Sequence, residues 1–135
     1  MSELGSHVAH ILSRDLDRLA EEVRAYPDEE GLWLDAPGIP NPGGTLALHL
    51  AGNLLHYVGA LLGASGYERD RDAEFFRRDV PRKEILDRIA EARQAVESVL
   101  PGLDGDELRR PFPQPPERMQ GVETGAFLLH LISHL

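Results

Sequence analysis

The sequence predicts an all-α protein, a four-helix bundle that forms one domain. Apolar residues recur at three- and four-residue spacing over long stretches, no useful stretch alternates with period two, and proline-rich segments separate the helical patterns. A chain of 135 residues has the length of one domain with one hydrophobic core. We therefore expect residues 1–135 to fold as a single helical bundle.

The first helix is predicted from about Leu4 to Tyr26. Its apolar residues lie on one stripe, with charged residues mostly elsewhere: Leu4, Val8, Ile11, Leu12, Leu16, Leu19 and Val23. Pro27 ends the pattern, and the proline- and glycine-rich segment DEEGLWLDAPGIPNPGG predicts a loop.

The second helix is predicted to start at Thr45 as N-cap and to end at Gly63. It is apolar nearly all round, which predicts that it is the most buried helix. The polar connection ASGYERDRDAEFFRRD follows, and we expect Phe75 and Phe76 to hold it against the core. Its alternating charges indicate a solvated, self-paired surface, so we assign residues 68–74 no role in a site.

The third helix is predicted from Asp79 as N-cap, with Pro81 in the first turn, up to Pro101. The segment LDGDELRRPFPQPPERMQG is too rich in proline for regular structure apart from a turn around 106–109. The fourth helix should begin near Thr124. Connections of this length leave crossover topologies open.

Composition excludes several classes of function. The chain has 23 acidic and 14 basic residues, a net charge of -9, which disfavours a nucleic-acid partner. No apolar run approaches the ~20 residues that span a bilayer, and no signal peptide is evident, so we expect a cytoplasmic protein that does not bind membranes. The absence of cysteine leaves only histidine and carboxylate side chains as ligands for a metal ion.

Two histidines near the end of the chain have the spacing of a metal-binding pair. His130 and His134 lie four residues apart on the predicted fourth helix, so both imidazoles project from one face. Histidines satisfied at the surface or in the core are an equally good interpretation of the spacing alone. Phe127 and Leu131 place the pair beside the core face, which favours the ligand role.

The second helix carries a further polar stripe of His49, Asn53 and His56 within an apolar run. A buried imidazole needs a partner, which either a hydrogen-bond network or a metal ion would provide. His49 and the pair His130 and His134 can converge inside a bundle, and three ligands plus a water form an open catalytic site. Zinc, nickel and iron all suit such ligands.

The remaining histidines, the loop aromatics and a pair of glycines are expected to have structural roles or no role in the site. His7 and His10 are expected to have no role in the site. Trp33 and Tyr67 are expected to anchor loops to the core. Gly43 and the following Gly44 precede a helix, but without a preceding strand or a lysine they are a very weak signal for phosphate binding.

The segments LWLDAPGIPNPGGTLALHLAGNLLHYVGALLGASGYERDRDAEF, VPRKEIL and FLLHLISHL resemble members of the DinB/YfiT-like superfamily over nearly the whole chain. The resemblance implies a four-helix bundle with up-down-down-up topology and long crossover loops, often homodimeric. It also implies a divalent ion, nickel or zinc, held by three histidines. His49 matches the first ligand and His134 the second.

The third family ligand would lie one turn beyond His134, where this chain stops at Leu135. Three explanations are open: the last helix is truncated at its C-terminus, the site is incomplete, or His130 substitutes for the third ligand one turn earlier. We expect truncation. In the site, His130 is expected to be the third ligand or a residue behind the ligands, and Asn53 to orient a ligand or water.

Two functions follow from these expectations. The first is a metal-dependent S-transferase or hydrolase, in which the ion activates a low-molecular-weight thiol or water for attack on a small electrophilic substrate. The thiols used by family members include bacillithiol, mycothiol and glutathione. The alternative is a metal-free, homodimeric helical interaction module without catalytic activity. Kinship of fold does not choose between them.

Overall fold

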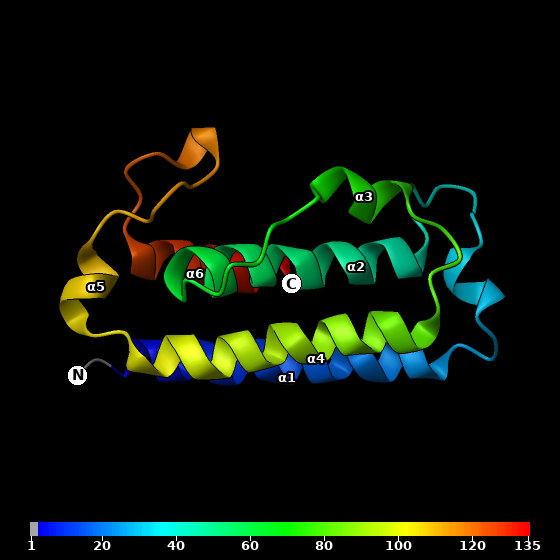
Figure 1. Ribbon diagram of the computed structural model, residues 1–135, viewed down its shortest axis with the longest axis horizontal. Coiled ribbons are helices and arrows are strands. Elements are labelled where there is room, and N and C mark those ends of the chain that lie inside the picture. Colours follow the sequence, from blue (N-terminus) through cyan, green and yellow to red (C-terminus); the bar gives the residue numbers. More distant parts are fainter. Residues whose placement is uncertain (1–2) are drawn as a thin grey trace.

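The computed structural model describes residues 3–135 and confirms the all-α class. Within this range the chain forms six α-helices and no strand beyond two isolated bridges. Four elements build the bundle in Figure 1: α1 (Leu4–Ala25), α2 (Gly43–Leu54) with a π-helical continuation (Leu55–Leu62), α4 (Arg82–Val99) and α6 (Thr124–His134). The short helices α3 (Arg71–Phe76) and α5 (Gly105–Arg109) lie in the connections.

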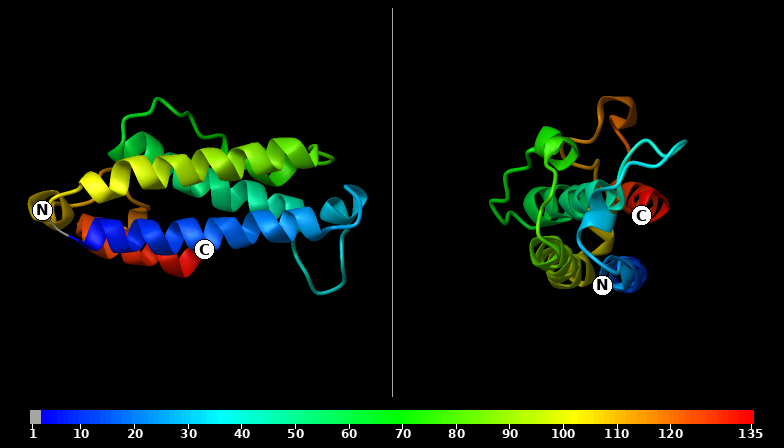
Figure 2. Two further views of the ribbon diagram at one scale, coloured as in Figure 1. Left: turned by 90° about the horizontal axis from the view of Figure 1, so that it is seen from below. Right: turned by 90° about the vertical axis from the view of Figure 1, so that its right-hand side faces the viewer.

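The bundle has two layers. α1 packs against α4, and α2 with its continuation and α6 lie over them (Figures 1 and 2). In Figure 1, α1 and α6 run from left to right, whereas α2 and α4 run from right to left. The loop before α3 and the segment between α5 and α6 rise from the α2 and α6 layer, and they border the site described below.

The core is built by the apolar stripes that the sequence pattern predicts. Leu12 and Leu16 of α1 and Ile85 of α4 are completely buried, as are Phe127 and Leu128 of α6. Burying a side chain of this size contributes about 1.5–3 kcal/mol to stability. The amphipathic pattern of each helix therefore fixes which of its faces meets the others.

Two predicted helix starts are wrong. α2 begins at Gly43 with Pro42 as N-cap, and Thr45 is buried inside its first turn, where it accepts a hydrogen bond from Arg78. α4 begins after Pro81, while Asp79 adopts a left-handed conformation with φ 56° outside the helix. In both places a proline with extended ψ comes directly before the first helical residue. The predicted helix end at Gly63 and the start of α6 at Thr124 are confirmed.

The helical stretch Gly43–Leu62 is, by length and composition, long and apolar enough to cross a membrane. The expectation that no apolar run reaches such a length is therefore wrong. The most apolar 18 residues of this stretch have a mean hydropathy of 1.3, and 56% of them are buried inside the bundle. The core helix of a bundle can have the same length and apolar composition, so this stretch is weak evidence for a membrane span.

The connections are held to the core by some of the predicted residues: Tyr67 is partly buried and packs against the core, whereas the prediction for Phe76 is wrong. Phe76 is 77% exposed, while Glu74 and Val80 are buried on either side of it. Trp33 anchors its loop as expected, because its indole N–H donates to the carbonyl oxygen of Val80 at 3.3 Å. The packing of Trp33 also explains Gly44, since a Cβ atom there would collide with the indole.

Candidate functional site

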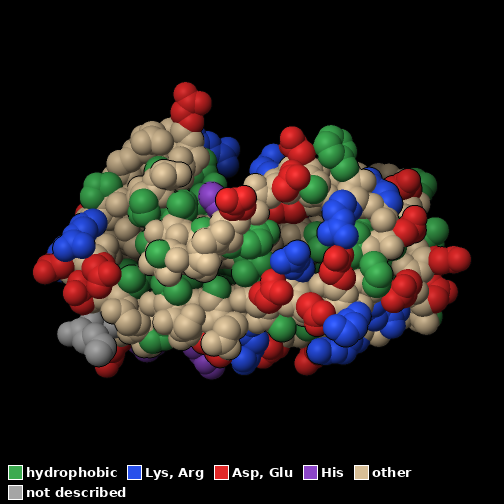
Figure 3. All heavy atoms as spheres, in the orientation of Figure 1, with side chains coloured by type: hydrophobic (Ala, Val, Ile, Leu, Met, Phe, Trp, Pro, Cys, Tyr) green, Lys and Arg blue, Asp and Glu red, His purple; other side chains and the backbone are tan. Residues whose placement is uncertain are grey.

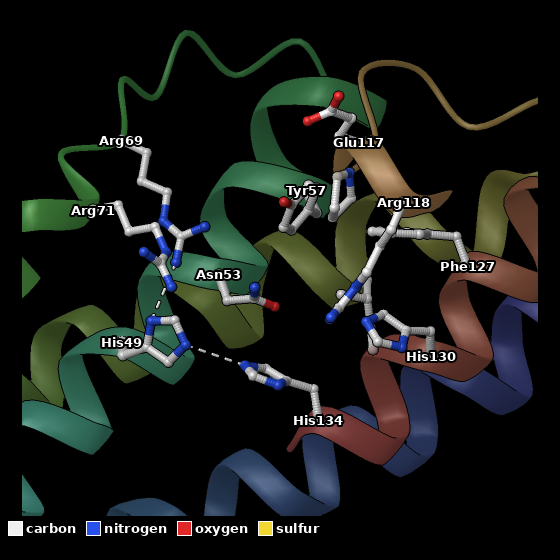
Figure 4. Close-up of a pocket in the computed structure, with 12 residues that line it drawn as sticks. His49, Asn53, Tyr57, Arg69, Arg71, Glu117, Arg118, Phe127, His130 and His134 are labelled. Carbon is white, nitrogen blue, oxygen red and sulfur yellow. Dashed lines mark hydrogen bonds between the residues drawn. The ribbon is translucent and has the colours of Figure 1, made fainter. Parts of the chain in front are cut away.

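An open cavity of about 680 Å³ lies at the α2 and α6 layer. Figure 4 shows side chains entering it from α2 and its π-helical continuation, from α6, from the start of α3 and from the segment before α6. Its lining consists of His49, Asn53, Tyr57, Arg69, Arg71, Pro116, Glu117, Arg118, Phe127, His130, Leu131 and His134. The cavity therefore contains all four residues that the sequence predicts for a site.

Two of the predicted ligands meet in this cavity. The Nε2 atoms of His49 on α2 and His134 on α6 lie 3.2 Å apart, and their rings stand nearly perpendicular at 82°. The two residues are 85 positions apart in the sequence. Only the packing of the bundle brings these nitrogens together.

The other ring nitrogen of His49 faces a buried ion pair. Nδ1 lies 3.1 Å from Oε1 of Glu74, and both oxygens of Glu74 accept hydrogen bonds of 2.9 Å from Arg69. The side chains of Arg69 and Glu74 are only 9% and 8% exposed. The expectation that residues 68–74 form a solvated surface without a role is therefore wrong for this pair, because α3 folds back over α2 and covers it.

This ion pair influences the tautomer of His49. When Nδ1 carries the proton and donates to Glu74, the lone pair of Nε2 points at His134 and into the cavity. Arg69 also approaches Nδ1, at 3.3 Å, and would favour the opposite tautomer. The carboxylate is the closer and negatively charged neighbour, so we assign the proton to Nδ1.

Glu74 remains ionised in its buried position. Burial acts to raise the pKa of its carboxyl group, but hydrogen bonds from His49 and Arg69 outweigh burial and leave the pKa below its usual value. Gly52 on α2 gives the carboxylate its space, since a Cβ atom at this position would collide with Oε2 of Glu74.

His134 has the character of a neutral imidazole. Its partial burial, with the nearby His49 and His130, lowers the pKa of His134 below its usual value. His130 lies one turn earlier on α6 and lines the same cavity, with its ring 5.7 Å from that of Phe127. Within residues 3–135, no three His, Asp or Glu side chains lie close enough to hold one ion together. The structure thus brings His49 and His134 together and leaves His130 apart from them.

The polar stripe predicted on the second helix is only partly right. Asn53 lines the cavity, but Tyr57 rather than His56 accompanies it. The wider π-helical turn after Leu54 rotates each residue less about the helix axis than an α-turn, which moves Tyr57 into line with His49 and Asn53. The ring of His56 packs against that of Tyr57 instead.

The remaining histidines lie outside the cavity. His7 is exposed and 3.8 Å from Glu3, and His10 is exposed on α1. The sequence interpretation missed Arg69, Glu74 and Tyr57. Asp70 carried a usable signal, because its side chain caps α3 by accepting from the Ala73 N–H, and a helix start there places Glu74 on the first turn.

Comparison with known families agrees with this architecture. The family model of the DinB superfamily matches residues 11–135, nearly the whole chain. The chain belongs to the DinB superfamily. No curated protein and no solved structure shows a significant match to it.

The spacing of His49 and His134 in this DinB-superfamily chain suits the binding of one divalent ion. Two nitrogens that bind one tetrahedral zinc ion at about 2.0–2.1 Å lie roughly 3.3 Å apart. The Nε2 atoms of His49 and His134 have nearly this separation. The carboxylate of Glu74 behind His49 is the partner that histidine ligands of metals usually have. These residues therefore fit a site with two protein ligands and open positions for water or substrate.

Proposed function

We propose that this DinB-superfamily protein is a metal-dependent enzyme that activates a low-molecular-weight thiol or water for attack on a small electrophilic substrate. The convergence of the Nε2 atoms of His49 and His134, with Glu74 behind His49, carries the proposal. These two histidines would hold a divalent ion, nickel or zinc first and iron as a further candidate. His130 is the candidate for a third ligand because it lines the same cavity.

The chemistry proposed for the ion is Lewis acidity, which lowers the pKa of a thiol or water that binds beside it. The chain's own residues prepare the site. Glu74 holds the proton at Nδ1 of His49, so that Nε2 presents its lone pair. The amide of Asn53 lies in the cavity wall, where it can orient the attacking group.

Metal uptake tests the proposal without any assay of activity. Untagged protein is stripped with EDTA, dialysed against zinc or nickel and analysed for its elements. We expect about one ion per chain in the natural sequence and strongly reduced uptake in His49→Ala and His134→Ala. His10→Ala is the matched control, because it removes an exposed histidine outside the cavity. Stoichiometric uptake by His49→Ala would overturn the assignment.

The metal-free interaction module remains the second candidate, and one observation favours it. A separation of 3.2 Å between Nε2 atoms also suits a hydrogen bond between two neutral imidazoles, and no third ligand joins the pair within residues 3–135. This candidate predicts no bound metal in any variant. It also predicts a homodimer, which sedimentation velocity would detect.

A further inference from the structure

The cavity is positively charged in a chain whose net charge is -9. Arg69, Arg71 and Arg118 all line it. Figure 3 shows the molecule hollowed between two lobes, with Lys or Arg side chains on both sides of the hollow. A local cluster of this sign, opposite to that of the whole molecule, attracts an anion into the cavity.

Within residues 3–135, two of the three arginines have no acidic partner. Arg69 is neutralised by Glu74, but the side chains of Arg71 and Arg118 make no hydrogen bond or ion pair among residues 3–135. The guanidinium of Arg71 makes a cation–π contact instead, with its central carbon 5.2 Å from the centroid of the Phe75 ring. Their N–H groups are therefore free to bind a ligand.

The two arginines enter from opposite walls. Arg71 comes from the start of α3, and Arg118 comes from the segment between α5 and α6 and points down toward His130 (Figure 4). Glu117 also belongs to the lining, but in Figure 4 its carboxylate points up and away from the two histidines. The inner part of the cavity thus keeps its positive charge.

Beside the arginines lies an apolar surface. The partly exposed ring of Tyr57 provides this surface. It meets the ring of Phe127 edge-on at 5.1 Å, and Phe127 is completely buried and stacks on Phe112 with ring centroids 4.0 Å apart. Leu131 of α6 also borders the cavity but is only 2% exposed. A rigid aromatic surface of this kind accepts a flat or short apolar group.

We propose that the cavity binds a small organic anion, a carboxylate carried on an apolar body, as its substrate. Arg71 and Arg118 hold the carboxylate, because the planar guanidinium matches its two oxygens. The apolar body lies against the exposed part of Tyr57, with one end near the His49 and His134 pair. The inference rests on the proposed function only in naming this anion as the substrate.

The test is an NMR titration of EDTA-treated protein with benzoate, with uncharged benzamide of nearly the same shape, and with inorganic phosphate. We expect saturable benzoate binding at one site, and roughly tenfold weaker binding of benzamide and phosphate, which lack the charge and the apolar body respectively. Arg71→Gln and Arg118→Gln should each weaken benzoate binding about tenfold. Arg24→Gln, which removes an exposed charge outside the cavity, should leave it unchanged.

Two results would overturn the inference: benzamide or phosphate binding as tightly as benzoate, or benzoate affinity unchanged in both cavity variants. Both arginines are exposed, so their variants should keep the fold, which circular dichroism verifies. His49→Ala separates the two proposals. It should lose metal uptake and retain benzoate binding, so each proposal can fail while the other stands.

Discussion

Glu74 is the residue on which the organisation of the site depends most. Its carboxylate links Arg69 to Nδ1 of His49 in a part of the molecule that water scarcely reaches. Removing one member of such a buried network leaves the others without a partner, which costs more than the loss of an exposed ion pair.

Replacing this carboxylate tests that dependence. We expect Glu74→Gln to lower the free energy of unfolding by about 1–3 kcal/mol, because Arg69 then lacks a counter-charge. Metal affinity should fall about 10–100-fold, as is usual when the partner of a histidine ligand is removed. The control Glu84→Gln breaks the ion pair with Arg77, in which the side chain of Arg77 is 45% exposed and that of Glu84 39%. It should lower the free energy of unfolding by no more than about 1 kcal/mol.

The pH dependence of the same variant has a definite sign. Because the pKa of Glu74 is lower in the folded chain than its ordinary value of 4.5, its ionised form stabilises the fold at neutral pH. That contribution is present above the ordinary pKa and is lost as the pH falls through the lowered one. Urea unfolding at several pH values should show the natural protein and Glu74→Gln converging in acid. A difference that grows toward low pH would contradict this role.

At the scale of the helix, α2 owes its close approach to α3 to a glycine. Alanine normally stabilises a helix interior by about 1 kcal/mol relative to glycine. At Gly52, however, the added methyl group would collide with the Glu74 carboxylate. At Gly59, a Cβ atom would meet Ala95 and Ser65 only at ordinary contact distances of 3.5 Å.

The two glycines therefore form a matched pair for mutagenesis. We expect Gly52→Ala to lower the melting temperature and to weaken metal uptake, because it displaces Glu74 from His49. Gly59→Ala should leave metal uptake unchanged and be neutral or stabilising by up to about 1 kcal/mol. Equal melting temperatures for the two variants would show that Glu74 moves aside without cost.

At the scale of the whole molecule, the site is built from three helices that are far apart in the sequence. His49 belongs to α2 and His134 to α6, while Glu74 belongs to α3. An ion held between α2 and α6 would bind the folded chain and not the unfolded one, so it would stabilise the entire bundle by mass action.

Thermal unfolding measures this coupling. At a free nickel concentration 100-fold above its dissociation constant, the stabilisation is about 2.7 kcal/mol, on the order of a 10 °C rise in melting temperature for a chain of this size. The double variant His49→Ala with His134→Ala should show no rise. An unchanged melting temperature of the natural protein with nickel, in the absence of aggregation, would instead support the metal-free module.

The expected homodimer and cytoplasmic location stay predictions.

The sequence by itself determined the helical class, the boundaries of α1 and α6, the apolar faces of the bundle and the choice of His49 and His134 as candidates. The helical features follow from apolar spacing and from prolines that end helices, which are local properties. The two histidines follow from their spacing, from the lack of cysteine and from the resemblance to the DinB/YfiT-like superfamily. Only the tertiary structure decided that the Nε2 atoms of the two histidines meet, that Glu74 and Arg69 are buried behind His49 and that Arg71 and Arg118 face one cavity. Those facts depend on how α3 folds back on α2 and on a π-helical turn that rotates Tyr57 into line. Neither leaves a periodic trace, because a charged segment such as ERDRDAEF has the same pattern whether it lies on the surface or covers a site.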